Sequence, residues 1–355
     1  MTNIVLDVRN LSVEFTSDEK RVLAVNNISF QLKRGQTLGI VGESGSGKSV
    51  TSLAVMGLMP PSAKVTGEIY FKSKSGQSDD ETIDLLTLKD REKPSYRGGK
   101  IAMIFQEPMT SLNPVYTIGF QLIEAILQHQ ELSTQQAIWK ASERLQQVQL
   151  LPTDEKIREQ FREEFRKKSD GEPQQKEIDD YINQQKRAFL SRYPHQLSGG
   201  QLQRVMIAMA ISCEPDILIA DEPTTALDVT VQADILNLLR TLRDNLNMSL
   251  IFISHDLGVI AEIADTVAVM YQGEIRETKN VLQIFSNPED PYTKALLACR
   301  PSLERHQERL PIVSDFMDVV TDKDGKIVEI KEKSGSPDPN QKSQVITENP
   351  QSPSP

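Results

Sequence analysis

The sequence predicts an α/β fold in which parallel strands alternate with helices. The first observation is a compact apolar run at residues 37–42 that ends in glycine and precedes a helical pattern at 48–59. The second is a regular alternation of helix-like and strand-like segments that begins after Ser198. In such a sheet we expect the functional site at the carboxyl ends of the strands.

The N-terminal part is predicted to be rich in strands. Short strands with turns are expected over residues 3–41, because "IVLDVRNLSVEF" and "NNISFQL" alternate apolar and polar residues. Further strands are expected at 67–71 and 101–105, with a polar loop at 72–82 between them.

The pattern changes to helix from Thr117 to about Leu190, where "IGFQLIEAILQH" has apolar residues at helical spacing. Within this region, residues 153–187 carry many charges of both signs and a narrow apolar stripe that is typical of a solvated helix pair broken near "SDGEP". The stripe consists of Ile157, Phe161, Phe165, Ile178 and Ile182.

The C-terminal half returns to an α/β rhythm. Its predicted elements are helices at 200–212, 230–247 and 257–264, and strands at 216–220, 249–254 and near 266–278. Residues 334–355 are rich in Pro, Ser, Asn and Gln, which predicts a disordered tail.

Composition narrows the possible classes of protein. The net charge of -10 and pI near 5.1 argue against a nucleic-acid partner, which would need a basic face. We expect neither a signal peptide nor a membrane helix, so that any work at a membrane would go through a partner. Cys213 and Cys299 form no CxxC pair, which argues against zinc or iron–sulfur ligation.

The segment "GESGSGKS" matches the phosphate-loop pattern G-x-x-x-x-G-K-[ST] and lies between a predicted strand and a predicted helix. Lys48 would supply a charge to the β- and γ-phosphates, and Ser49 a hydroxyl to Mg²⁺. The alternative is a glycine-rich turn with a chance lysine. The predicted ATP-binding residues are Gly42, Glu43, Ser44, Gly45, Ser46, Gly47, Lys48, Ser49 and Val50.

A pair of carboxylates follows the buried run "DILIA". Asp221 is predicted to hold Mg²⁺ through water, and Glu222 to act as the general base that polarises an attacking water. The alternative is a pair of exposed carboxylates at a strand end.

Three further motifs occur in order after the phosphate loop: "LSGGQ" at 197–201, "DEPTTALD" at 221–228 and "ISHD" at 253–256. Together with the phosphate loop, these three motifs make residues 4–300 resemble the ATP-binding cassette (ABC) family. The resemblance implies a P-loop NTPase fold with a mixed central sheet, an N-terminal antiparallel β subdomain and a helical subdomain that carries the signature.

The resemblance also implies a domain organisation. A nucleotide-binding domain would span 1–290, with a helical subdomain at about 107–197 that contains the charged insertion at about 153–187. An extension of the peptide-importer type would follow at 291–333, before the tail.

Further roles follow from the resemblance alone. It makes Gln106 a catalytic and Mg²⁺-site residue that senses the membrane partner, His255 the switch that contacts the γ-phosphate, and Phe15 the ring that stacks on adenine. It places Asp228 at a dimer interface. The alternatives are a surface glutamine for Gln106, a histidine satisfied by a backbone carbonyl for His255, and a core residue for Phe15.

The signature "LSGGQ" has two compatible interpretations. S-x-x-Q is an ordinary capping box, and a capped helix N-terminus without bulky side chains is also an anion site. In the family this stretch meets the ATP of the other subunit, so the chain would pair with a second ATPase subunit, either a paralogue or an identical chain. The residues assigned to that ATP are Leu197, Ser198, Gly199, Gly200, Gln201 and Asp228.

Residues 105–126, together with "YPHQLSGGQ", "ALDVTVQADIL" and "NPEDPYTKALLACRP", resemble the peptide and nickel importer subfamily. This implies an ATPase subunit that energises uptake of di- or oligopeptides. It would sit on the cytoplasmic face of the membrane, bound to two membrane-spanning permease subunits and served indirectly by an extracytoplasmic substrate-binding protein. The alternatives are nickel or another solute, a soluble ABC ATPase acting on ribosomes or DNA, and a non-hydrolysing regulatory module.

Two features depart from the subfamily. The extension "RPSLERHQERLPIVSDFMDVV" contains no cysteine, so we expect no iron–sulfur cluster. The charged segment 153–187 lengthens the connection before the signature. It is either a tolerated surface insertion, because long insertions cost little, or a contact site for a partner.

Overall fold

The computed structural model divides into two compact units, Met1–Val281 and Leu282–Pro355. It describes residues 3–16, 21–74, 82–107, 111–168, 171–225, 227–299, 313–321 and 327–333. The tail predicted at 334–355 and most of the polar loop predicted at 72–82 lie outside these ranges. Within them, no helix has the length and apolar character needed to cross a membrane.

The central sheet of the first unit is mixed, as the resemblance to the ABC family implies. Its strands are β3 (Thr37–Val41), β6 (Ile101–Ile104), β7 (Ile217–Asp221), β8 (Ser249–Ser254), β9 (Thr266–Tyr271) and β10 (Glu274–Asn280). Their order is β10-β9-β3-β8-β7-β6, with only β10 antiparallel to its neighbour. Every residue of β3, β7 and β8 is buried, which explains their continuous apolar runs.

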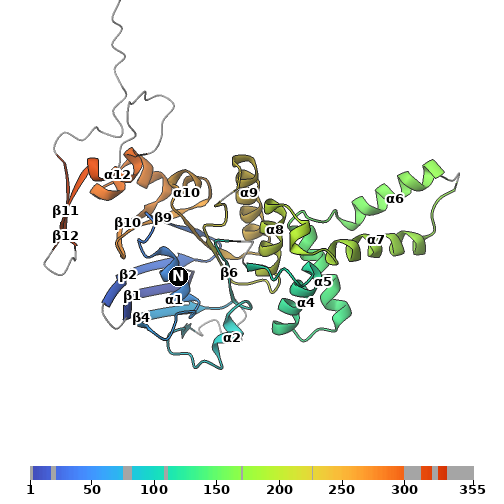
Figure 1. The fold of residues 1–355 in the computed structure, drawn as a ribbon, viewed down its shortest axis with the longest axis horizontal. Helices are drawn as coiled ribbons and strands as arrows, with labels where there is room; N and C mark the ends of the chain where they lie inside the picture. The colour runs from blue at the N-terminus through green and yellow to red at the C-terminus, as the bar shows by residue number, and fades with distance from the viewer. Residues whose placement is uncertain are drawn as a thin grey trace, which may run out of the picture. The chain divides into compact units, whose positions relative to one another are not determined.

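Helices cover this sheet (Figure 1). They are α1 (Lys48–Val55), α8 (Gly199–Ala210), α9 (Val229–Asn245) and α10 (Leu257–Ile263). The helix α10 packs closely on β3, since a Cβ at Gly39 would lie 2.8 Å from the Ile260 side chain. The predicted α/β alternation is therefore confirmed, with helix boundaries that differ from the predicted ones by at most four residues.

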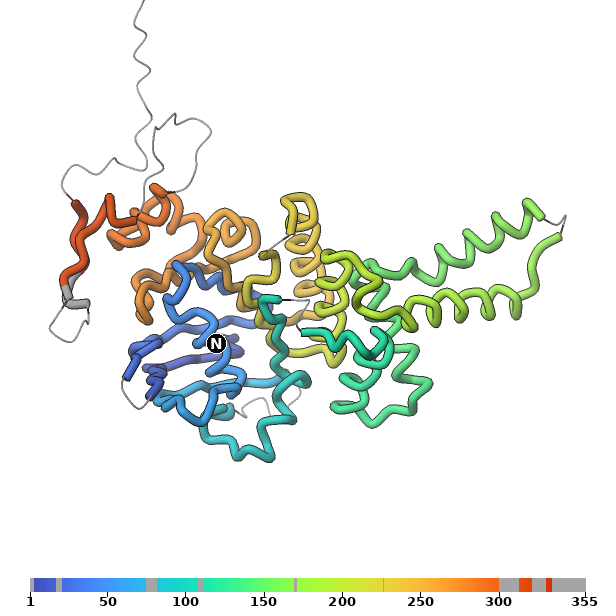
Figure 2. The backbone as a smooth tube through the Cα atoms, viewed as in Figure 1, coloured from blue at the N-terminus to red at the C-terminus, as the bar shows by residue number. Residues whose placement is uncertain are grey.

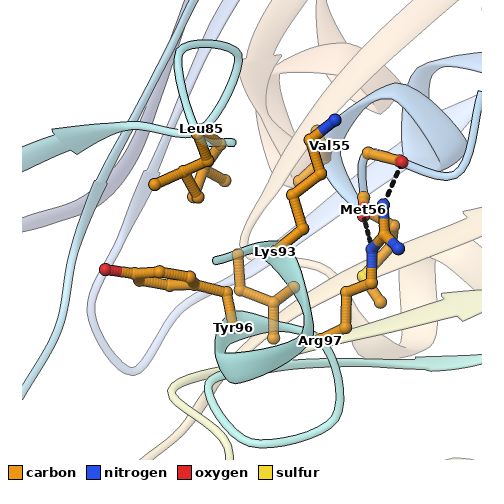
Figure 3. Close-up of a pocket in the computed structure, with 9 residues that line it drawn as sticks. Val55, Met56, Leu85, Lys93, Tyr96 and Arg97 are labelled. Carbon is orange, nitrogen blue, oxygen red and sulfur yellow. Dashed lines mark hydrogen bonds between the residues drawn. The ribbon is translucent and has the colours of Figure 1, made fainter. Parts of the chain in front are cut away.

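The helix α1 ends at Val55, four residues before the predicted end. Gly57 adopts a left-handed conformation with φ 62°, and the Leu58 amide donates to the Leu53 carbonyl, which is a Schellman ending. Arg97 completes it, because its guanidinium donates to the carbonyls of Met56 and Gly57. Figure 3 shows Arg97 beside a small pocket at this helix end.

The N-terminal antiparallel sheet consists of β1 (Ile4–Thr16), β2 (Arg21–Lys33), β4 (Ala63–Lys72) and β5 (Thr82–Asp84), in the order β2-β1-β4-β5. The prediction of short strands was wrong in length, since β1 and β2 have 13 residues each. Register shifts, such as the one between Val8 and Leu11, interrupt the alternation and made one bulged strand resemble several short ones.

The helical part of this unit contains α4 (Ile118–His129), α5 (Thr134–Gln147), α6 (Asp154–Lys168) and α7 (Gln175–Leu190). The predicted helix pair is confirmed as α6 and α7, which lie side by side in Figure 2. Ile157, Ile178 and Ile182 form a small buried cluster between them. An ion pair between Lys186 and Asp154, at 2.7 Å, joins the C-terminal part of α7 to the first residue of α6.

The second unit contains most of α11 (Val281–Ser286), and α12 (Pro291–Ala298), β11 (Met317–Thr321) and β12 (Ile327–Glu332). β11 and β12 pair antiparallel, with Val319 opposite Ile330. Ala295, Ala298 and Phe316 form its small core.

Candidate functional site

The phosphate-loop residues 42–47 connect β3 to α1 and wrap around Lys48. The Lys48 side chain is 5% exposed, and its Nζ donates to the carbonyl oxygens of Gly42 and Glu43, both at 2.8 Å. Burial lowers the pKa of Lys48, while the nearby Glu222 and Asp221 carboxylates raise it. The lysine is therefore held in place within the loop before any phosphate arrives.

The backbone of this loop depends on glycine where it passes other segments. Gly47 has φ 99°, and a Cβ there would lie 2.6 Å from the Ala24 carbonyl oxygen. At the tip, Glu43, Ser44 and Gly45 are exposed. Ser46 and Val50 lie on the inner side, where Val50 packs against the main core. The loop thus has a rigid inner wall and an open tip, as an anion cradle requires.

Asp221 ends β7 and lies beside Ser49. Burial raises the pKa of Asp221, whereas a hydrogen bond with Ser49 lowers it. Its buried Oδ1 has no hydrogen-bond partner among the described residues. An unsatisfied buried carboxylate oxygen beside a hydroxyl fits a hard cation such as Mg²⁺. Across the described ranges there is no group of three or more His, Cys, Asp and Glu that could hold a metal ion.

Glu222 follows β7 in a left-handed conformation, with φ 47°, which is uncommon for a residue with a side chain. Its amide donates to the Ile253 carbonyl of β8, at 3.0 Å. Its Oε2 accepts from Gln106 Nε2 at 3.3 Å and lies 3.1 Å from His255 Nδ1. The structure therefore brings together three residues that the sequence assigned to catalysis from three separate motifs.

A fourth residue meets the same oxygen. Thr225 Oγ1 donates to Glu222 Oε2 at 3.0 Å, and the sequence analysis did not single it out. Its position three residues after the carboxylate, beyond Pro223, is a turn spacing that could have drawn attention to it.

The signature residues begin α8. Ser198 and Gln201 form the predicted capping box, with Ser198 N bonded to Gln201 Oε1 at 3.1 Å. Leu197 is buried, whereas Ser198 and Gly199 are exposed. A Cβ at Gly199 would meet no atom of the described residues within 4 Å, while one at Gly200 would meet Val231 of α9 at 2.9 Å.

The signature helix and the phosphate-loop helix have different neighbours. The helix α8 packs against α4, α5 and β6, whereas α1 packs against β1, β2 and β7. The two glycine-rich stretches therefore lead into helices that pack on different elements of the first unit, and Gly199 is exposed.

The two remaining predicted residues have visible structural roles. Asp228 caps α9 by accepting from the Val231 amide at 3.0 Å, and the neighbouring Val229 is 83% exposed. Phe15 is half-buried in β1 and packs against the main core, as the alternative interpretation of a core residue predicts.

Comparison with protein families assigns the chain. A family model described as ABC transporter matches residues 25–225, which is more than half of the sequence. The chain belongs to the ABC transporter family. The family name, in which ABC denotes an ATP-binding cassette, implies that this domain binds ATP.

Curated relatives carry a more specific name. The glutathione import ATP-binding protein GsiA of Escherichia coli K12 is 47% identical over 317 residues, covering 87% of this chain and 45% of that protein. GsiA of Salmonella typhimurium LT2 has the same identity and coverage. The chain thus spans about half the length of the curated relatives it matches.

Solved structures agree on the fold. The ATP-binding cassette MJ0796, described as a dimer in a post-hydrolysis state bound to ADP and phosphate, has a TM-score of 0.59 at 25% identity, covering 78% of this chain and 98% of that one. CbiO1 from Clostridium perfringens has a TM-score of 0.58 at 21% identity, covering 80% and 92%.

Proposed function

We propose that this chain is the ATP-hydrolysing subunit of an importer for di- or oligopeptides. The observation that carries the hydrolytic part is the convergence of Gln106 and His255 on the Glu222 carboxylate, one residue after Asp221. The name of the GsiA relatives supports the peptide part, since glutathione is a tripeptide.

The proposed reaction is ATP + H₂O → ADP + phosphate. The loop around Lys48 would bind the β- and γ-phosphates, and His255 would contact the γ-phosphate. Glu222 would accept the proton of the attacking water. Bound Mg²⁺, held by Ser49 and Asp221 with Gln106 nearby, would neutralise charge on the phosphates. Most of the catalysis in this arrangement is electrostatic positioning.

The exposed signature supports a dimer. Ser198 and Gly199 would close on the γ-phosphate held by a second ATPase subunit, because they face away from the chain's own contacts. ATP binding would add an attraction that exists only in the closed dimer, and so would shift the equilibrium toward closure. Asp228 and the exposed Val229 would lie at the same interface.

An apolar surface supports docking on membrane-spanning subunits. Tyr116 and Phe120 stack at 4.6 Å and are 45% and 47% exposed, beside Val115 at 70%. These residues lie at the start of the helical part, nine to fourteen positions after Gln106. A permease segment bound there would influence the position of the Gln106 side chain. The chain would thus work at the cytoplasmic face of the membrane, with a substrate-binding protein acting from outside.

The test of hydrolysis uses the full chain, purified with the subunits that co-purify with it. Glu222→Gln should retain ATP affinity within about twofold and lower turnover by at least about 100-fold. Near-normal hydrolysis by this variant would remove Glu222 as the base.

The test of the solute is separate. Cells that lack the chain should lose uptake of labelled di- and tripeptides, and should recover it with the wild-type chain but not with Glu222→Gln. Loss of nickel uptake with intact peptide uptake would replace the peptide proposal by the nickel alternative. Co-purification with ribosomes or DNA instead of permeases would overturn the transport proposal.

A further inference from the structure

Glu222 Oε2 is held from its own loop as well as from other elements. Gln106 follows β6 and His255 follows β8, whereas Thr225 lies only three residues after the carboxylate. The Thr225 amide donates to the Glu222 carbonyl at 3.2 Å, and its hydroxyl donates to Glu222 Oε2 at 3.0 Å. Thr225 therefore donates two hydrogen bonds to Glu222, one from its backbone amide and one from its side chain.

Under the proposed function, the three contacts to Glu222 Oε2 respond differently to nucleotide binding. Gln106 would turn toward the Mg²⁺ site and His255 toward the γ-phosphate, so that both would have a second partner when nucleotide is bound. Thr225 is tied to the Glu222 backbone by the turn, and so its hydroxyl moves with the carboxylate. It is the contact best placed to persist through the catalytic cycle.

We infer that Thr225 is a positioning residue for hydrolysis: its hydroxyl holds Glu222 Oε2, which leaves Oε1 to face the attacking water. The inference rests on the proposed ATPase activity. A glutamate side chain has three rotatable bonds, so its carboxylate has several orientations, and fixing one of them is the kind of pre-organisation on which the rate depends steeply. The left-handed backbone of Glu222, with φ 47°, already aims the side chain, and Thr225 fixes its last torsion.

A purely structural role for Thr225 makes a different prediction. The Thr225 side chain is exposed, so replacing it by valine buries no unsatisfied group. A structural role would lower the melting temperature and affect substrate affinity and turnover together. A positioning role lowers kcat alone, because ATP is bound by other residues.

The experiment compares Thr225→Val, which is nearly isosteric, with Thr225→Ser, which keeps the hydroxyl. Thr241→Val on α9 is the matched control, because Thr241 is exposed and its hydroxyl donates only to the Asn237 carbonyl of its own helix in the bonds described. All are made in the full chain and assayed with its co-purifying subunits for ATP affinity, KM, kcat and melting temperature.

We expect Thr225→Val to lower kcat about 10-fold, with KM and ATP affinity within twofold, as loss of one bond to a charged group predicts. Thr225→Ser should stay within threefold of wild type, and Thr241→Val should not differ from it. Wild-type kcat in Thr225→Val, an equal fall in Thr225→Ser, or a melting temperature lowered by more than about 5 °C would overturn the inference. Absence of hydrolysis by the wild-type complex would instead overturn the proposed function.

Discussion

The phosphate loop and the signature are both short, glycine-rich stretches that lead into a helix, yet the structure treats them differently. In the loop, Lys48 is buried and bonded to the carbonyls of Gly42 and Glu43. In the signature, Ser198 and Gly199 are exposed, and the bonds of Ser198 go to Gln201 of the same motif. The inner wall of the phosphate loop is therefore enclosed by its own chain, whereas the start of the signature helix is exposed.

The difference teaches how each stretch acquires its shape. Gly42 and Gly47 are required by segments far away in sequence, since a Cβ would lie 2.1 Å from the Met270 carbonyl oxygen and 2.6 Å from that of Ala24. The signature has a local capping box, and of its two glycines Gly200 alone approaches another described element, since a Cβ there would lie 2.9 Å from Val231 of α9. A motif whose local geometry is complete and whose outer face is open is suited to a partner molecule.

The largest expected effect comes from a substitution in the phosphate loop. Lys48→Ala removes the charge inside the loop, and ATP affinity should fall at least about 100-fold because charge-assisted bonds to phosphate are lost. Titration calorimetry measures this. Lys33→Ala, at the exposed end of β2, is the control and should bind ATP like wild type. Retention of affinity within threefold by Lys48→Ala would refute the assignment of the loop.

The next effect separates the two stretches. Ser198→Arg places a bulky cation on the open face, so turnover should fall about 30-fold while ATP still binds the chain's own loop within twofold. Steady-state hydrolysis and calorimetry together measure both quantities. Ser191→Arg, at the exposed end of α7, is the matched control. If Ser198→Arg, combined with Glu222→Gln, still formed the closed dimer by size exclusion, the outward role of the signature would be wrong.

A smaller effect compares the glycines directly. Gly47→Ala forces a side chain into a left-handed position against the Ala24 carbonyl, and the strain of about 1–3 kcal/mol should lower the melting temperature by roughly 5 °C. Gly199→Ala meets open space in the described part of the chain, and should leave the melting temperature within about 1 °C. Differential scanning calorimetry of both variants decides. Equal losses would mean that the signature is as tightly packed as the loop.

The smallest effect concerns the helix pair that precedes the signature. Deleting residues 155–186 should leave ATP binding and turnover within about twofold, because α6 and α7 pack on each other through their own small cluster. The two ends left by the deletion can be joined with a short linker, because the hydrogen bond from Lys186 to Asp154 in the intact chain shows that they lie close together. Loss of co-purifying subunits would instead identify the pair as a partner contact, whereas unchanged assembly and transport would leave it a tolerated insertion.

Local patterns predicted the parts of the structure that depend on local physics. The continuous apolar runs became buried parallel strands, and the stripe from Ile157 to Ile182 became the seam between α6 and α7. The capping box at Ser198 formed as expected, because its bonds join residues three apart.

Non-local contacts account for much of what the sequence analysis missed. The end of α1 combines a local signal, Gly57 in a left-handed conformation, with a distant one, Arg97, which donates to the Met56 carbonyl from 41 residues away. The length of β1 was hidden by register shifts that only its pairing with β2 reveals. Thr225 lies inside the motif "DEPTTALD", but its role was missed because the motif does not show that the rotamer and backbone of Glu222 bring Oε2 to the Thr225 hydroxyl.

The sequence by itself determined the family, the α/β order of elements and, apart from Thr225, the charged and hydroxyl groups at the site, because motifs and periodicity are properties of neighbours along the chain. Only the tertiary structure decided that Gln106, Thr225 and His255 meet one oxygen of Glu222, and that Gly199 opens outward. Parallel pairing of β6, β7 and β8 brings the ends of distant strands to one edge, and there the chemistry assembles.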